Sequence, residues 1–261
     1  MIALSGCVEA LFGDRPFVNR IAAVAELGIP AFEFWGYANK DIDAIVKTKT
    51  ETELTCAAMV CDAGGPLVSA DTRGKVAEAV KCSIAVANRL QCQTMIVTVG
   101  QEIEGVARSE QHRNIVESLK IAAPLVEAAG ITLVVEPLNT AVNHAGYFLA
   151  ASTEGFQIVD EIGSPSVKLL YDIYHQQITE GNLIDTITAN IDRIGHFHMA
   201  DVPGRHEPGT GEINYEQVFR AISETTYNGY IGLELWPTRP EVEALADTLK
   251  WAQRYFGTMR T

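Results

Sequence analysis

The chain has 261 residues, of which 47% are hydrophobic, and its formal net charge at pH 7 is −13. The 33 acidic residues outnumber the 20 basic ones, which argues against nucleic acid or an anionic membrane as a partner, because few cations are available for phosphate contacts. No signal peptide is evident at the N-terminus, and no run reaches the roughly 18 apolar residues of a membrane helix. The sequence therefore predicts a soluble cytoplasmic protein.

Cysteines occur only in the first third of the chain. None belongs to a CxxC pair, their number is odd, and several lie within apolar runs. We expect reduced, buried thiols rather than disulfides or metal ligands. The residues are Cys7, Cys56, Cys61, Cys82 and Cys92.

Short apolar runs alternate with amphipathic patterns along the whole chain. The apolar runs predict strands at 2–7, 31–36, 54–62, 94–100, 131–139, 167–175, 194–201 and 230–237. The amphipathic patterns predict helices near 14–28, 41–49, 70–90, 115–130, 153–162, 183–191, 215–224 and 242–255. Asp14 is the predicted cap of the first helix, and Gly28 is its predicted stop.

This alternation predicts an α/β fold in which a parallel sheet is covered by helices. Repeating the unit eight times in about 250 residues is typical of a (β/α)8 TIM barrel. We therefore expect one such barrel, as a single domain over 1–261. No GxGxxG follows the first predicted strand and no GxxxxGK[ST] occurs in the chain, so the usual nucleotide-binding signatures are missing.

Four residues near successive strand ends are candidate metal ligands: Glu136, Asp172, His198 and Glu234. The active site of such a barrel lies at the carboxyl ends of its strands, where these side chains would converge. Three carboxylates so close together would be forced to hold protons, whereas a divalent cation would neutralise them. The ligand set suits Mn²⁺, Mg²⁺ or Co²⁺. His196 would lie one layer deeper, where a packed core histidine is favoured over a ligand.

Other residues near strand ends keep two interpretations each. Glu33 and Asp62 lie at strand ends in the opposite half of the barrel. Each could be a polar group of the rim or a substrate contact. Trp35 and Trp236 could form a wall against sugar carbons or pack beneath the loops.

Four segments resemble the hydroxypyruvate isomerase family: VVEPLN, YDIYH, GHFHMADVPGRHEPGTGEINY and the glutamate of GLELWP. That family belongs to the xylose-isomerase-like TIM barrels, as do the ketose 3-epimerases. The resemblance covers essentially the whole chain and is densest over 131–237. It implies that the four strand-end residues hold a metal and that Glu136 and Glu234 are the catalytic acid/base pair. It also implies that His175 and Arg205 contact substrate oxygens.

Two residues in and after the predicted strand at 194–201 favour different substrates. Many hydroxypyruvate isomerases carry Gln where this chain has His198, whereas ketose 3-epimerases carry His. The loop around Arg205 instead resembles the isomerases, and this guanidinium could hold the carboxylate of a keto acid. We therefore predict a metal-dependent isomerase that converts hydroxypyruvate to tartronate semialdehyde through an enediolate. The alternative is a 3-epimerase of a free ketose such as D-tagatose, D-psicose or L-ribulose.

A remote alternative is a metal-dependent DNA-repair endonuclease of the same superfamily, which would need a basic face. The net charge of −13 argues against it. A homo-oligomer, either a dimer or a tetramer, is expected from the family alone.

Overall fold

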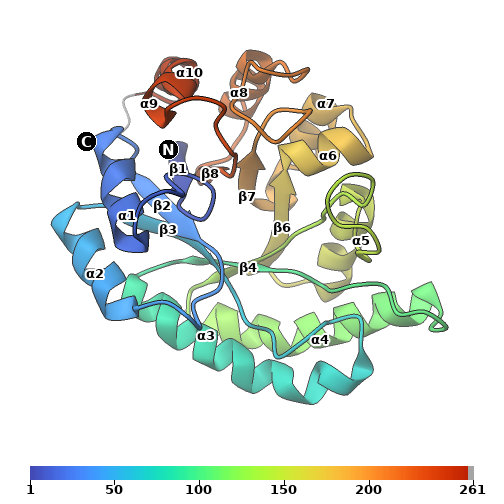
Figure 1. The fold of residues 1–261 in the computed structure, drawn as a ribbon. Helices are drawn as coiled ribbons and strands as arrows, with labels where there is room; N and C mark the ends of the chain where they lie inside the picture. Colours follow the sequence, from blue (N-terminus) through green and yellow to red (C-terminus); the bar gives the residue numbers. More distant parts are fainter. Residues whose placement is uncertain (258–261) are drawn as a thin grey trace.

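The computed structural model describes residues 1–257, and within them eight parallel strands form a closed barrel (Figure 1). Each strand pairs with its neighbour in the sequence, and the last pairs with the first. The strands are β1 (Ala3–Cys7), β2 (Ala31–Phe34), β3 (Thr55–Val60), β4 (Thr94–Val97), β5 (Thr132–Val135), β6 (Val167–Asp172), β7 (Ile194–Met199) and β8 (Tyr230–Leu233). The predicted (β/α)8 barrel is confirmed.

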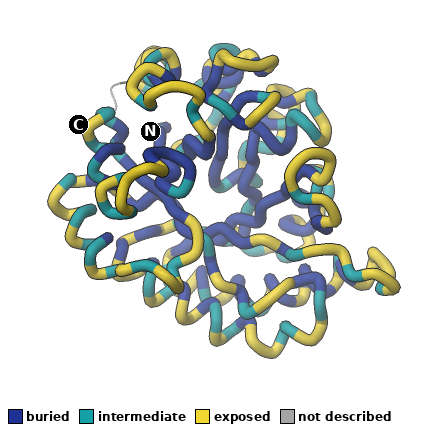
Figure 2. The backbone as a smooth tube through the Cα atoms, in the orientation of Figure 1, coloured by how far each residue is buried: buried dark blue, intermediate teal, exposed yellow. Residues whose placement is uncertain are grey.

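Helices surround this barrel and cover its outer face. Figure 2 shows that the tube is buried along the strands and becomes exposed on the outer sides of the helices and in the loops. Within residues 1–257, no helix is long and apolar enough to cross a membrane. The helices are α1 (Phe17–Glu26), α2 (Ile42–Glu51), α3 (Val76–Leu90), α4 (Arg108–Ala128), α5 (Ser152–Ile162), α6 (Ile173–Thr179), α7 (Leu183–Ala189), α8 (Tyr215–Ser223), α9 (Glu241–Ala244) and α10 (Ala246–Phe256).

Several predicted element boundaries are wrong. Helix α4 begins at Arg108 instead of near 115, and β5 and β8 end at Val135 and Leu233 instead of at 139 and 237. Two other differences have a clear local cause. Strand β6 ends at Asp172, and the residues up to His175 form the first turn of α6 instead of continuing the strand. The Asp172 carboxylate accepts a hydrogen bond from the His175 N–H at 3.1 Å, so the residue that ends the strand also caps the helix. Helix α1 begins after Pro16, which occupies the cap position predicted for Asp14. The fixed φ of proline suits the start of a helix.

The prediction of buried thiols is wrong for Cys82, which is exposed on α3, and correct for the other four cysteines. Burial also raises the pKa of the Cys61 thiol to about 11, which keeps it protonated and unreactive.

We expect one thiol per folded chain to react with Ellman's reagent, and all five to react after unfolding in guanidinium chloride. The Cys82→Ser protein should show no fast reaction. Rapid reaction of any thiol in that variant would contradict the burial of the other four cysteines.

Candidate metal centre

The carboxyl ends of β5 to β8 bring four side chains together. Asp172 is the last residue of β6 and His198 lies in β7, whereas Glu136 and Glu234 directly follow β5 and β8. Each offers one ligand atom, and these four atoms lie within 4.8 Å of one another. All four residues are buried, the most exposed being Glu136 at 7%. The strand-end positions noted in the sequence thus meet in one cluster.

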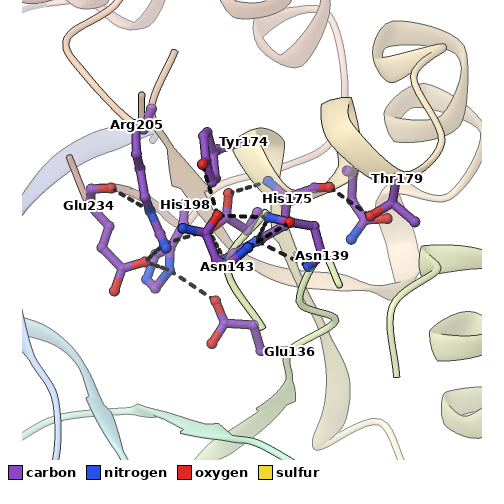
Figure 3. A network of polar contacts seen from close by, with 12 residues as sticks. Glu136, Asn139, Asn143, Tyr174, His175, Thr179, His198, Arg205 and Glu234 are labelled. Atoms are coloured by element: carbon purple, nitrogen blue, oxygen red, sulfur yellow. Dashed lines mark hydrogen bonds and ion pairs between the residues drawn. The ribbon is translucent and has the colours of Figure 1, made fainter. Parts of the chain in front are cut away.

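His198 faces the carboxylates of both glutamates of this cluster (Figure 3). Its Nδ1 atom lies 3.1 Å from Glu234 Oε2 and 3.4 Å from Glu136 Oε1. Among residues 1–257, no aligned hydrogen-bond partner satisfies this buried nitrogen. A buried nitrogen that faces carboxylate oxygens without a directed hydrogen bond is suited to share a cation with them. The residues present therefore fit a divalent cation.

The carboxylates differ in their affinity for protons. Burial raises the pKa of Glu136 to about 6, and the nearby charges of Glu234 and Asp172 add to this effect, against the attraction of His198. Burial also acts on Glu234, but attraction to His198 and Arg205 outweighs it and lowers the pKa of that carboxyl. The expectation that crowded carboxylates would hold protons therefore applies to Glu136 and is wrong for Glu234, because two cationic side chains compensate its charge.

Arg205 lies over the cluster, from the long loop between β7 and α8. Its Nη2 atom is 3.1 Å from Asp172 Oδ2 and also contacts Glu234 Oε2. The guanidinium carbon lies 5.0 Å from the ring centre of Tyr174 and 5.4 Å from that of Trp236. Arg205 has a φ of 60°, a conformation that costs a residue with a side chain on the order of 1–3 kcal/mol. The backbone conformation is thus one that surrounding contacts must enforce.

Those contacts involve the loop itself and the segment after β8. The Arg205 N–H donates to the Asp201 carbonyl at 3.1 Å, and the Trp236 N–H donates to the Arg205 carbonyl at 2.9 Å. The buried carboxylate of Asp201 accepts hydrogen bonds from the N–H groups of Gly209 at 2.8 Å and Gly211 at 2.9 Å. Glu207, which is also buried, accepts from the Thr238 N–H at 2.9 Å. These bonds fix the position from which Arg205 reaches the cluster.

His175 lies beside the cluster on the first turn of α6, and its ring is fixed by Asn139 (Figure 3). The backbone N–H of Asn139 donates to His175 Nδ1 at 3.1 Å, and its side-chain amide lies 2.7 Å from the same nitrogen. Because Nδ1 accepts, the hydrogen of the neutral ring is on Nε2, which lies 3.5 Å from Asp172 Oδ2. Burial lowers the pKa of His175 to about 4, so the ring is neutral at pH 7. His175 is therefore a neutral hydrogen-bond donor.

Glu33 and His196 meet inside the barrel, on the side of the His198 ring opposite Glu136 and Glu234. The Glu33 carboxylate on β2 lies with Oε1 2.9 Å from His198 Nε2 and with Oε2 3.0 Å from His196 Nε2. Glu33 is 1% exposed, so it is neither a polar group of the rim nor placed at the open mouth. His196 is buried, as expected, but it is hydrogen-bonded to a carboxylate rather than packed only against apolar groups.

The remaining candidates lie at the rim. The side chain of Asp62 is exposed and accepts a hydrogen bond from the Gly64 N–H at 2.8 Å. Trp35 and Trp236 are 40% and 41% exposed. The Trp35 indole N–H donates to Glu234 Oε1 at 2.6 Å, so Trp35 also fixes the orientation of this carboxylate.

Asn139 and Tyr174 have no role in the sequence-based prediction, although both lie in the segments that resemble the family. Asn139 is three residues after Glu136, and Tyr174 directly precedes His175. Their position within those segments is the feature of the sequence that could have identified them as site residues. Asn143 connects the two: its Oδ1 accepts from the Tyr174 hydroxyl at 2.8 Å and lies 3.1 Å from Asn139 Nδ2.

Comparison with known families agrees with this architecture. Residues 21–255 match the family model described as a xylose isomerase-like TIM barrel. The match covers most of the chain and therefore includes β2 to β8 and the whole candidate centre.

Two relatives define the family more narrowly. The chain is 31% identical to hydroxypyruvate isomerase of Escherichia coli strain K12, over 98% of this chain and 100% of the relative. It is 30% identical to 2-oxo-tetronate isomerase of Cupriavidus necator, over 96% of this chain and 97% of the relative. The chain belongs to the hydroxypyruvate isomerase family of xylose isomerase-like TIM barrels, and it is an enzyme of the isomerase class.

Solved structures resemble the same barrel. A protein from Brucella melitensis named AP endonuclease, family 2, is 29% identical with a TM-score of 0.90, and the similarity covers 98% of this chain and 99% of that one. A D-psicose 3-epimerase solved in the presence of D-fructose has a TM-score of 0.81 at 20% identity, over 98% and 99% of the two chains. At this low identity, the likeness to the epimerase shows the fold alone.

Proposed function

We propose that the protein is a divalent-metal-dependent isomerase of a small hydroxy-keto acid and that it converts hydroxypyruvate to tartronate semialdehyde. The observation that carries this proposal is the buried cluster of three carboxylates and one imidazole, with an arginine directly above it. The relatives named hydroxypyruvate isomerase and 2-oxo-tetronate isomerase support the same class of substrate.

One divalent cation would be held by Glu136, Asp172, His198 and Glu234. Oxygen ligands with a single imidazole suit Mn²⁺ or Mg²⁺, and Co²⁺ is also compatible. Such a cation would supply Lewis-acid polarisation of the substrate's carbonyl and adjacent hydroxyl, which favours the enediolate.

The two glutamates would move the proton. One carboxylate removes a proton from C3 of hydroxypyruvate, and a proton is returned to C2 of the enediolate. The hydroxyl proton on C3 passes to the oxygen on C2, so C3 becomes the aldehyde and C2 the alcohol, and no atom is gained or lost. Glu136 is suited to be the base, because Arg205 contacts the carboxylate of Glu234 and makes that glutamate the weaker base.

Two further side chains would orient the substrate. His175 presents a neutral Nε2–H that can donate to a substrate oxygen. Arg205 remains charged because Glu234 and Asp172 raise its pKa against the effect of burial. A fixed guanidinium at the mouth of the cluster favours a substrate with a carboxylate, and this favours a keto acid over an uncharged sugar.

A ketose 3-epimerase is the second candidate, because two observations favour it. His198 matches the residue that ketose 3-epimerases carry, and the half-exposed indoles of Trp35 and Trp236 could pack against sugar carbons. The chemistry would be the same until the second proton transfer, which would occur on the opposite face of the same carbon. A DNA-repair endonuclease is disfavoured by the net charge of −13.

The experiment is incubation of the Mn²⁺-loaded protein in D₂O with hydroxypyruvate, D-fructose or L-ribulose, followed by NMR. We expect tartronate semialdehyde labelled at C2 from hydroxypyruvate and no product from the ketoses. Deuterium at C3 of a ketose with inversion, together with no turnover of hydroxypyruvate, would identify the epimerase instead. No exchange with any of the three substrates would contradict both functions.

A further inference from the structure

Glu33 occupies a position inside the barrel where an isolated carboxylate would be strongly disfavoured. Its Oε2 atom accepts hydrogen bonds from the Ser5 hydroxyl at 2.6 Å and from His196 Nε2 at 3.0 Å. Its Oε1 atom lies 2.9 Å from His198 Nε2, in ion-pair contact although the ring N–H is not aligned with the oxygen. These three contacts compensate the burial of the carboxylate.

The Glu33 carboxylate occupies the space that a side chain at position 232 would fill. Gly232 on β8 is the register partner of both Ser5 on β1 and His198 on β7. A Cβ atom at Gly232 would lie 2.1 Å from Glu33 Oε1, a distance at which the carboxylate would have to move. Glycine at this position thus allows a side chain from β2 to reach across the barrel to His198.

The two nitrogens of His198 face two different acidic groups. Nε2 faces Glu33 below, whereas Nδ1 faces Glu136 and Glu234 above. A carboxylate on one nitrogen of an imidazole retains the hydrogen there and leaves the lone pair of the other nitrogen free for a cation. It also makes the ring a more basic ligand.

We propose that Glu33 is a positioning residue that orients His198 and fixes its ring hydrogen on Nε2, so that Nδ1 binds the divalent cation. This inference rests on the proposed cation centre and deepens it. Carboxylates in this position commonly raise metal affinity 10–100-fold, which gives the expected size of the effect.

A competing interpretation is that this region of the barrel binds a cation of its own. Glu33, His196 and His198 could themselves hold an ion, since ligand atoms of all three lie within 4.8 Å of one another. A second cation there would need His198 to bind through Nε2, and the hydrogen that Glu33 is proposed to retain would be lost. The number of ions bound per chain therefore separates the two interpretations.

The experiment is calorimetric titration of the metal-free protein with Mn²⁺ for three variants. We expect the wild-type protein to bind one ion, and we expect the dissociation constant of Glu33→Gln to rise about 10–100-fold. Gly232→Ala should weaken binding in the same direction, because it displaces the carboxylate without removing any polar group. Gly13→Ala is the matched control, since a Cβ atom there meets nothing within 4 Å, and it should bind as the wild type does.

NMR of the Mg²⁺-loaded, ¹⁵N-histidine-labelled protein provides a readout that a purely structural role would not change. We expect a protected Nε2–H of His198 in the wild type and a loss of its protection in Glu33→Gln. If Glu33→Gln does not fold, Gly232→Ala supplies both measurements. Unchanged Mn²⁺ affinity in a folded variant, or two ions per wild-type chain, would overturn the inference while leaving the proposed centre intact. No Mn²⁺ binding by the wild type would overturn both.

Discussion

Glu136→Gln is expected to lower kcat for hydroxypyruvate by about 10²–10⁴-fold, the usual contribution of a general base. Glutamine has the same size and retains one oxygen that can face the cluster, but it cannot accept the proton from C3. Without a cation, burial raises the pKa of Glu136 to about 6. A bound cation lowers this pKa again, so the wild-type carboxylate is ionised and able to accept a proton at neutral pH. We therefore expect deuterium incorporation from D₂O to fall with kcat.

The measurement is made at saturating Mn²⁺, with the affinity for Mn²⁺ determined separately by titration. This separates a lost base from a weakened ligand, because added cation restores only the latter. Glu104→Gln is the matched control, since Glu104 is exposed in the loop after β4 and should retain wild-type rates. A Glu136→Gln protein with more than one tenth of wild-type kcat would contradict the assigned role.

The barrel and the four strand-end residues could be predicted because both depend on local patterns. Parallel strands buried on both faces appear as apolar runs, and the carboxyl end of each run can be located to within a few residues. Once the barrel is inferred, consecutive strands are neighbours, so Glu136, Asp172, His198 and Glu234 must lie on one side of the mouth. The strand predicted at 167–175 was too long because the capping of α6 by Asp172 depends on geometry that the apolar pattern does not contain.

The environment of these residues could not be predicted in the same way. Glu33 and His196 are 163 positions apart in the sequence, and their contact exists only because side chains from opposite halves of the barrel meet in its interior. The space left by Gly232 has the same origin, because it depends on the register of β8 against β1 and β7. A glutamate at the end of a strand shows its position along the strand, but not how deep its carboxylate lies.

The charges of the cluster follow from this combination of near and distant contacts. His198 and Arg205 both lie against Glu234, which lowers the pKa of that carboxyl, whereas Glu136 remains the carboxyl with the raised pKa. The two glutamates have similar positions at strand ends but different neighbours, and such a difference is what separates an acid from a base in one site. Sequence position alone treats them as equivalent.

Asp172→Asn is expected to abolish tight binding of Mn²⁺ while preserving the fold. In the wild type, Asp172 Oδ1 caps α6 by accepting from the His175 N–H, and Oδ2 lies 3.1 Å from Arg205 Nη2. Asparagine and aspartate cap helices about equally well, so the first of these roles is retained. The negative charge is lost, and we expect the dissociation constant for Mn²⁺ to rise by at least about 100-fold, since even residues that only support a ligand contribute 10–100-fold.

Two further variants test whether the capping role of Asp172 is separate from its role in binding the cation. Asp172→Ala should lose the cap as well and be less stable than Asp172→Asn by about 1 kcal/mol in urea unfolding with a chelator present. Asp41→Asn is the matched control, because Asp41 caps α2 by accepting from the Ala44 N–H at 3.0 Å, far along the chain from the cluster, and its Mn²⁺ affinity should equal that of the wild type.

The cation should also stabilise the wild type against unfolding, by about 2.7 kcal/mol at a free Mn²⁺ concentration of 100 times its dissociation constant. At that same Mn²⁺ concentration, Asp172→Asn should gain less than about 0.5 kcal/mol, because a 100-fold weaker site is only half occupied. An Asp172→Asn protein that Mn²⁺ stabilises as strongly as the wild type would show that this carboxylate is not a ligand. Asp172 would then act only as the cap of α6 and the partner of Arg205, and the cation would have to be held by the glutamates and His198.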